Sequence, residues 1–167
     1  MKSLILNRLA VIGLGLAALT SCTNLNENSE WGNGSKVKFS SYIAGQKAVR
    51  ASGTAWTNGD QVGIFMKQGA TVKSANVKYV ADDRGNLTAA TASEALAYPS
   101  DNSAVDFVAY YPYAASAASG TYDVNVSNQS NLPAIDLLYA DNAKNKTSAS
   151  GDVNSGFTHK LTQIVLN

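Results

Sequence analysis

Short runs in which apolar and polar residues alternate are the feature that most restricts the fold of this chain. In a β-strand successive side chains point to opposite faces, so a period of two fits a strand with one buried face. Such alternation occurs at residues 36–40, 76–79, 105–111, 122–126 and 157–161, and a shorter apolar run at 62–66 is predicted to be a strand as well. The sequence therefore predicts an all-β domain.

Turn-forming residues separate these runs and keep the predicted strands short. Asn, Asp, Ser and Gly gather at residues 58–60, 82–86, 100–103 and 119–120, where they favour tight turns. An alanine-rich stretch at 89–97 is predicted to form one turn of helix at most. Short strands at this spacing are typical of an antiparallel β-sandwich or a barrel, and we favour the sandwich.

The first 21 residues have the pattern of a lipoprotein signal peptide. Lys2 and Arg8 give a positive start, and residues 9–19 form an apolar run that is too short for a permanent membrane span. Leu19-Thr20-Ser21-Cys22 matches the lipobox that precedes a lipidated cysteine, so Cys22 is the predicted lipidation site. The alternative is an ordinary secretory signal followed by a chance cysteine.

Residues 22–35 are rich in Asn, Ser and Gly and are predicted to be a flexible tether between the lipid and a domain at 36–167. Cys22 is the only cysteine, which excludes an intrachain disulfide and a cysteine metal site. The formal charge is +1, and it becomes −1 without Lys2 and Arg8. A chain so close to neutral has no electrostatic surface for nucleic acid.

Few residues indicate chemistry, so no catalytic residue, metal or cofactor is predicted, and the chain is not predicted to be an enzyme. The one histidine, His159, shares a strand face with Phe157 and Leu161. This face is expected to be buried, which favours a core histidine over a catalytic base. Asp82 and Asp83 faintly resemble a calcium loop but lack its other ligands, and a hairpin turn fits them better. No pair of carboxylates is singled out for glycoside hydrolysis.

The tyrosines allow two interpretations. Tyr98, Tyr110 and Tyr113 belong to dense clusters that would form a patch for glycan or host protein if they are exposed. The alternative is that the tyrosines around Pro112 fill the core and that the proline ends the strand.

Four motifs occur in an order that resembles the fimbrillin-like (Mfa-like) family of surface lipoproteins and pilus subunits. The resemblance covers roughly residues 36–167. Asn128 stands where the family often has Asp, and both residue types suit a turn. The motifs are Trp56-Thr57-Asn58-Gly59-Asp60-Gln61-Val62-Gly63-Ile64-Phe65, Phe107-Val108-Ala109-Tyr110-Tyr111-Pro112-Tyr113, Asn128-Gln129-Ser130 with Asp136-Leu137-Leu138-Tyr139-Ala140, and Phe157-Thr158-His159-Lys160-Leu161.

The resemblance implies a fold with two tandem β-sandwich domains of transthyretin-like type. Residues 36–167 would then be the N-terminal domain, incomplete at its C-terminal end, and we expect the sequence to be truncated before a second domain. A short family member is the alternative. An incomplete sandwich would expose an edge strand.

The resemblance also implies a mechanism and a location. Family members are lipid-anchored at the outer membrane and cell surface until an arginine-specific protease removes the N-terminal segment with its first strand. A strand from another pilus subunit then fills the groove by strand addition, and the processed protein becomes part of a fimbrium. Here the cut would fall between Arg50 and Ala51. The removable strand would be Lys36, Val37, Lys38, Phe39, Ser40, Ser41, Tyr42 and Ile43.

Three functions stay open on sequence alone. The first is a structural or accessory pilus subunit, with other subunits as partners and the membrane reached through the lipid on Cys22. The second is a surface lipoprotein that binds glycan or host protein through the tyrosines without polymerising. The third is an enzyme with a cleft around His159 or paired carboxylates. Arg50 is also compatible with a solvated loop that no protease cuts.

Overall fold

The computed structural model describes residues 34–44, 55–128, 130 and 132–161. The predicted signal peptide, Cys22, most of the tether, Arg50 and Ala51 lie outside the described residues. Within the described part, the search for a helix with the length and apolar character of a membrane span finds none.

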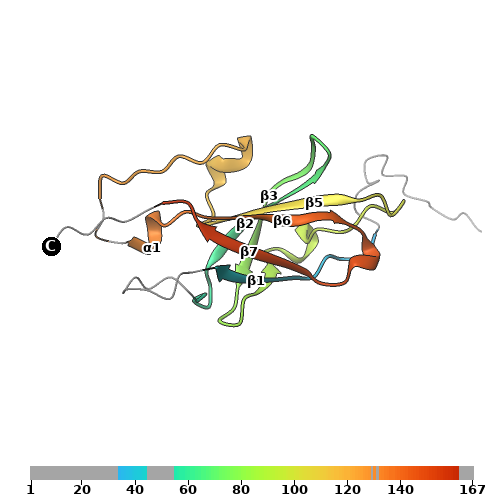
Figure 1. Cartoon of the computed structure of the whole chain (residues 1–167), viewed down its shortest axis with the longest axis horizontal. Coiled ribbons are helices and arrows are strands. Elements are labelled where there is room, and N and C mark those ends of the chain that lie inside the picture. Colours follow the sequence, from blue (N-terminus) through green and yellow to red (C-terminus); the bar gives the residue numbers. More distant parts are fainter. Residues whose placement is uncertain (1–33, 45–54, 129, 131, 162–167) are drawn as a thin grey trace, which may run out of the picture.

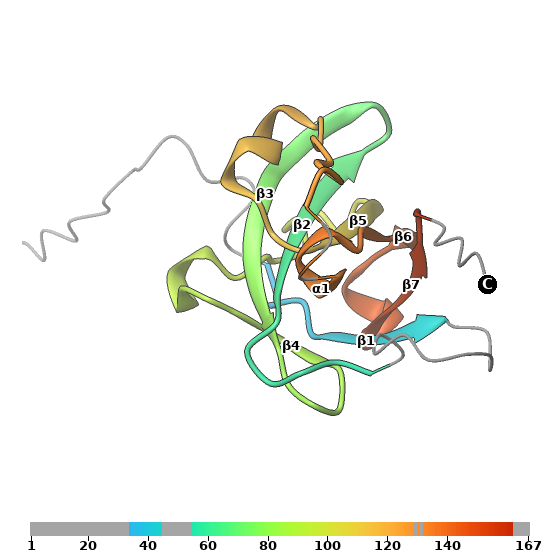
Figure 2. The same cartoon turned by 90° about the vertical axis from the view of Figure 1, so that its left-hand side faces the viewer.

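Seven strands form one sheet in the described part of the chain, and the sheet closes on itself in the order β1-β4-β3-β2-β5-β6-β7 (Figures 1 and 2). Short helical turns connect some of the strands. The strands are β1 (Phe39–Ala44), β2 (Gln61–Gln68), β3 (Thr71–Ala81), β4 (Asn86–Ala89), β5 (Val105–Tyr111), β6 (Leu138–Lys146) and β7 (Val153–His159). The helical turns are η1 (Ala92–Glu94), η2 (Ala115–Ser119), α1 (Leu132–Ile135) and η3 (Ser148–Ser150).

The all-β class is confirmed, but the predicted antiparallel sandwich is not the arrangement observed. Strand β1 pairs with β4 on one side and with β7 on the other, so the sheet is a closed barrel. The β1–β7 pair is parallel, whereas the other pairs of the barrel are antiparallel. Closure gives the outer strands a partner on both sides, which removes the free edges of an open sheet.

Apolar side chains that alternate along the strands fill the barrel interior. In β5, Val105, Phe107 and Ala109 are buried while Asp106 and Val108 are half-buried, as the period of two predicts. The predicted apolar run 62–66 forms most of β2. The largest fully buried side chains are Tyr79, Phe107, Phe157, Ile64, Met66, Leu138, Val62, Val105 and Val153.

One predicted strand is wrong. Residues 122–126 form no strand, and Val126 is 50% exposed, although Tyr122 and Val124 are half-buried as their alternation suggests. The alternation records which side chains face the domain, but a strand also needs a neighbour for its backbone hydrogen bonds. The strands of the closed barrel already pair with one another, so this segment has no sheet edge to join.

The alanine-rich stretch at 89–97 contains a single helical turn, η1, as the sequence predicts. The end of the predicted tether behaves differently from a flexible linker. The Ser35 carbonyl accepts a hydrogen bond from the Tyr98 amide at 3.0 Å, and a Cβ on Gly34 would lie 1.7 Å from the Tyr98 carbonyl oxygen. The last two residues of the predicted tether, Gly34 and Ser35, therefore pack against the domain.

Candidate functional site

Strand β1 completes the barrel and is the candidate functional element. The predicted removable strand, residues 36–43, overlaps β1 at Phe39–Ile43, and its first two residues, Lys36 and Val37, lie alongside Ala97 and Leu96. In Figure 1 β1 runs beside β7, and Figure 2 shows it between β4 and β7 at the lower side of the barrel. The sheet is continuous at this point only because β1 is present.

The contact of β1 with β7 is long and regular. The two strands are parallel over the full length of β1, from Phe39 opposite Val153 to Ala44 opposite Thr158. Just before this register, the Val153 amide donates to the Lys38 carbonyl at 2.8 Å. Main-chain pairing of this kind gives affinity without depending on side-chain identity.

Tyr42 covers β7 from the outside. It lies opposite Gly156, and a Cβ on that glycine would be 2.6 Å from the Tyr42 hydroxyl oxygen. The Tyr42 side chain nevertheless remains 52% exposed. It therefore contacts the neighbouring strand from outside the barrel and is not part of the core.

The contact of β1 with β4 is short. Only Phe39 with Leu87 and Ser40 with Asn86 are in register. Beyond them an open groove of about 350 Å³ runs along the seam, lined by Val37, Lys38, Phe39, Ser40, Tyr79, Asn86, Leu87, Thr88, Ala89, Ala95 and Asp152. Strand β1 is thus held strongly on one side and weakly on the other.

Two inward side chains of this segment enter the core. Val37 and Phe39 are 6% and 5% exposed, so the predicted alternation of residues 36–40 is confirmed. The Phe39 ring makes edge contacts with Tyr79 at 5.2 Å and with Phe107 at 5.0 Å between centroids. Since buried T-shaped aromatic pairs stabilise beyond their buried area, Phe39 is the main side-chain anchor of β1.

The third inward position, Ser41, contacts a backbone. Its amide and its hydroxyl both donate to the Gly85 carbonyl oxygen, at 2.7 and 2.8 Å. A Cβ on Gly85 would lie 2.1 Å from the Ser41 carbonyl oxygen, and the φ of Gly85 is +83°. Glycine is required here for the close approach and for the left-handed backbone. Sequence reasoning missed this contact. The signal that the sequence offered was a glycine, Gly85, in a predicted turn.

Gly85 belongs to the predicted hairpin turn at 82–86, which the structure contains. The Asp82 carboxylate accepts hydrogen bonds from the amides of Arg84 and Asn86 and from the Asn86 side chain, at 2.7–2.9 Å. These hydrogen bonds, those from Asn86 foremost, lower the pKa of Asp82. A carboxylate that accepts three donors within its own turn supports a hairpin turn over a calcium loop.

The candidate tyrosine patch does not form as proposed. Tyr98 and Tyr110 are only 3% and 6% exposed, because Tyr98 belongs to the hydrophobic core and Tyr110 is covered by its neighbours Asn76, Ala114 and Tyr122. The Tyr110 hydroxyl donates to Asn76 Oδ1 at 2.6 Å and accepts from the Ala114 amide at 3.1 Å. Tyr113 is half-buried, with Lys78 Nζ 4.7 Å from its ring centroid. Burial removes two of the three tyrosines from any binding surface.

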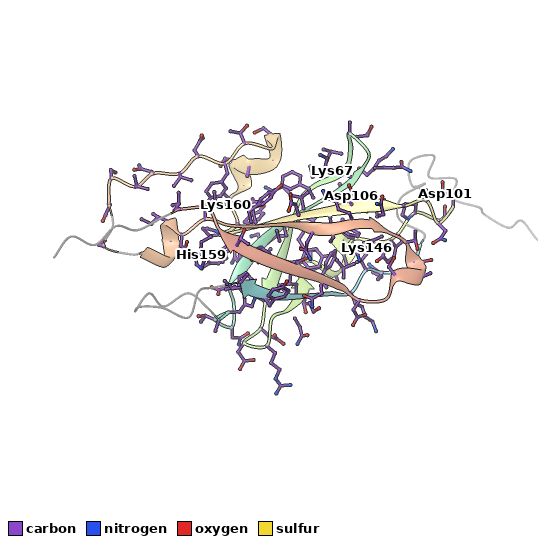
Figure 3. The ribbon with its side chains drawn as sticks, in the orientation of Figure 1. Lys67, Asp101, Asp106, Lys146, His159 and Lys160 are labelled. Atoms are coloured by element: carbon purple, nitrogen blue, oxygen red, sulfur yellow. The ribbon has the colours of Figure 1, made fainter. Side chains whose placement is uncertain are left out.

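The predicted burial of His159 is wrong. His159 is exposed because β7 ends there, and its Nδ1 lies 2.9 Å from Asp136 Oδ1 at the surface. Figure 3 shows His159 and Lys160 together at the end of β7 near α1, away from Lys146 and Asp101. Leu161 is also exposed, at 37%. Among the residues that the structure describes, no group of three His, Cys, Asp or Glu side chains is placed to hold a metal ion.

Taken together, the fold and the β1 seam define an all-β domain whose continuity depends on its first strand. A family model described as fimbrillin-like matches residues 49–167. The chain belongs to the fimbrillin-like family, which confirms the resemblance seen in its motifs. The matched region begins after β1.

One similar protein is the "Putative fimbrium subunit Fim1C" of Bacteroides uniformis, which is 34% identical over 156 residues. The alignment covers 90% of this chain and 51% of that protein, so the chain spans about half the length of the curated relative it matches.

Two crystal structures are also similar. The first is of "a putative cell adhesion protein from Bacteroides uniformis", with 35% identity and a TM-score of 0.61 over 75% of this chain and 47% of that one. The second, from Bacteroides ovatus, carries the same description; it has 19% identity and a TM-score of 0.53 over 75% of this chain and 52% of that one. The second likeness concerns the fold alone.

Proposed function

We propose that this protein is a structural or accessory subunit of a cell-surface fimbrium, exported as a lipoprotein through Cys22. Cleavage between Arg50 and Ala51 releases β1, and a strand of another subunit takes its place. The observation that carries the proposal is the position of β1, which closes the barrel between β4 and β7. The names of the relatives, a fimbrium subunit and a cell adhesion protein, agree with a role at the cell surface.

Loss of β1 would leave the edge of β7 unpaired and a site in the core empty. The backbone of β7 would lack the partner that now runs from Phe39 to Ala44, and the core would lack the Phe39 ring between Tyr79 and Phe107. An unpaired strand edge recruits another strand, and an emptied apolar site favours refilling. A strand added from a second subunit would pair with β7 and fill the core site.

Partners follow from this proposal. They are other fimbrial subunits, through main-chain pairing along β7, and the membrane, through the lipid on Cys22 before processing. The role is structural rather than enzymatic, and it involves no nucleic acid. The alternative of a non-polymerising lipoprotein that binds glycan or host protein loses its main support, because Tyr98 and Tyr110 are buried.

The test uses the product of the complete gene, purified without residues 1–21 and with Cys22→Ala. Treatment with an arginine-specific protease is expected to give a single cut after Arg50, located by N-terminal sequencing, and a ladder of SDS-resistant oligomers on an unboiled gel. The variant Arg50→Lys should abolish the cut and the ladder. The control Arg84→Lys changes the other arginine of the region, which lies exposed in the 82–86 turn, and should leave both unchanged.

A cut at Arg84 alone would overturn the proposal, and so would a cut after Arg50 without oligomers. Either result would leave the protein a surface lipoprotein that keeps its first strand.

A further inference from the structure

We infer that the site occupied by β1 selects an incoming strand by a short pattern of side chains. The pattern is a large aromatic residue at the position of Phe39, then any residue, then a small hydroxyl residue at the position of Ser41. The strand enters parallel to β7, and its outward positions are free. This inference rests on the proposed function and names the chemistry of the partner strand.

The direction follows from the backbone. Strand β7 presents one edge to β1, and the register from Phe39 opposite Val153 to Ala44 opposite Thr158 is parallel throughout. The edge of β4 contributes only two residue pairs. A strand that enters along β7 in the same direction satisfies the longer edge, and β4 then adds a short antiparallel contact.

The aromatic position follows from the shape of the core. Phe39 lies between Tyr79 of β3 and Phe107 of β5, with interplanar angles of 75° and 89°. Phe107 also makes an edge contact with Tyr98 at 6.0 Å. A side chain with less volume would leave a cavity among rings that are already fixed by their neighbours, so the site discriminates by size.

The hydroxyl position follows from the Gly85 carbonyl. That oxygen accepts from both the amide and the hydroxyl of Ser41, which is 8% exposed. The backbones of Ser41 and Gly85 approach so closely that a Cβ on Gly85 would overlap the Ser41 carbonyl oxygen. Because the Ser41 side chain is buried and its hydroxyl lies 2.8 Å from this carbonyl, a larger side chain would have to displace the 82–86 turn, and an apolar one loses a hydrogen bond.

The outward position that follows Ser41 accepts variation. Tyr42 is 52% exposed and rests on Gly156, where β7 has no side chain of its own. Its replacement removes one surface contact and leaves the core and the backbone pairing in place. The pattern therefore discriminates at alternate positions only, as expected when one face of a strand is buried.

The test offers labelled synthetic peptides to the purified protein after it has been cut at Arg50 and the cut segment freed with mild urea. The peptides span residues 35–44 with the native sequence or with Phe39→Ala, Ser41→Leu or Tyr42→Ala. Incorporation is measured as label that stays with the protein on an unboiled gel. The native and Tyr42→Ala peptides should enter equally, and the other two should require at least tenfold higher concentration.

The outcomes separate the two ideas. If the native peptide enters and all three variants enter equally well, the side-chain pattern is wrong while strand replacement stands. If the native peptide fails to enter a protein shown to be cut after Arg50, strand replacement and the pattern fall together. The protein variant Gly85→Ala gives an independent check. It should accept the native peptide less well, and equal uptake would contradict the role of the Gly85 contact.

Discussion

The two sides of the barrel are built in different ways. On one side β2, β3 and β5 are long antiparallel strands, and β2 and β3 are joined by a tight turn at residues 69–70. On the other side β1 joins β4 and β7, which lie far from it in the sequence, through one parallel and one very short antiparallel contact. The first side contains a hairpin of consecutive strands and long antiparallel contacts, whereas the second depends on a single inserted strand.

This difference teaches where the fold can be opened. Removing a strand such as β5 would break two antiparallel ladders and the core around Phe107. Removing β1 would break one ladder over its length, a two-pair contact and the ring contacts of Phe39, and would leave the β2–β3 and β2–β5 ladders paired. The comparison predicts that changes at the β1 seam have local consequences.

The largest effect is expected for Phe39→Ala, which removes a buried ring that anchors β1 to the other side of the barrel. Large-to-small changes of this kind cost about 3–5 kcal/mol in the free energy of unfolding. The control Tyr42→Ala, on the exposed face of the same strand, should cost less than about 1 kcal/mol. Urea unfolding measures both.

Hydrogen exchange of Phe39→Ala would sharpen the comparison. Amides of β1 and β7 should lose protection before those of β2 and β3, because the seam opens first. Equal loss of protection on both sides would show that the barrel opens as one unit. It would contradict the prediction that the β1 seam opens first.

A smaller effect is expected when alanine replaces glycine in two turns. Gly69, between β2 and β3, and Gly85, beside β1, both have a positive φ, and only Gly85 lacks room for a Cβ. Gly69→Ala should cost about 1–2 kcal/mol from the left-handed backbone alone. Gly85→Ala should cost about 1–3 kcal/mol more, because the turn must move away from Ser41. Thermal or urea unfolding gives the difference in the free energy of unfolding. Equal costs would contradict the role of the close contact between Gly85 and Ser41.

The smallest effect concerns Tyr111 at the end of β5. Burial, followed by the nearby Asp60 carboxylate, raises the pKa of Tyr111 to about 12 from an ordinary 10. A raised folded-state pKa gives stability that is complete below pH 10 and is lost as the pH rises toward 12. Wild-type protein should lose this stability over that range, while Tyr111→Phe should not show the same loss.

Urea midpoints across this alkaline range, with phenolate absorbance as a second measurement, check the Tyr111 prediction. Titration of Tyr111 near its ordinary value would contradict it. The hydroxyl lies 3.3 Å from Asp60 Oδ1, so the substitution also tests that contact.

Local patterns in the sequence predicted the strands well where alternation alone decides the structure. The run 105–111 is the same as β5, and Val37 and Phe39 face the core as expected. Residues 122–126 show the limit of this reasoning, since alternation cannot reveal whether a neighbouring strand exists. His159 shows another limit, because its position on the strand face loses meaning where β7 ends.

The candidate site was predictable in part. The resemblance carried by the motifs implied that residues 36–43 are a strand, which agrees with β1 from Phe39 onward, while removal of this strand by a cut at Arg50 stays a prediction. The parallel pairing of β1 with β7 depends on residues more than 100 positions apart, and nothing in either segment alone specifies that pairing. The Ser41–Gly85 contact also depends on how a distant turn is placed against β1. Such long-range geometry is set by the whole barrel and not by local sequence.

The parallel pairing of β1 with β7 also affects the order of events during synthesis. A ribosome makes β1 early, yet the strand that pairs along its full length begins about 110 residues later, at Val153. Closing so long a loop carries an entropic cost that local hairpins such as β2–β3 avoid. In a nascent chain the β2–β3 hairpin can therefore form before the barrel closes. Strand β1 can pair with β7 only after nearly the whole described domain has been synthesised.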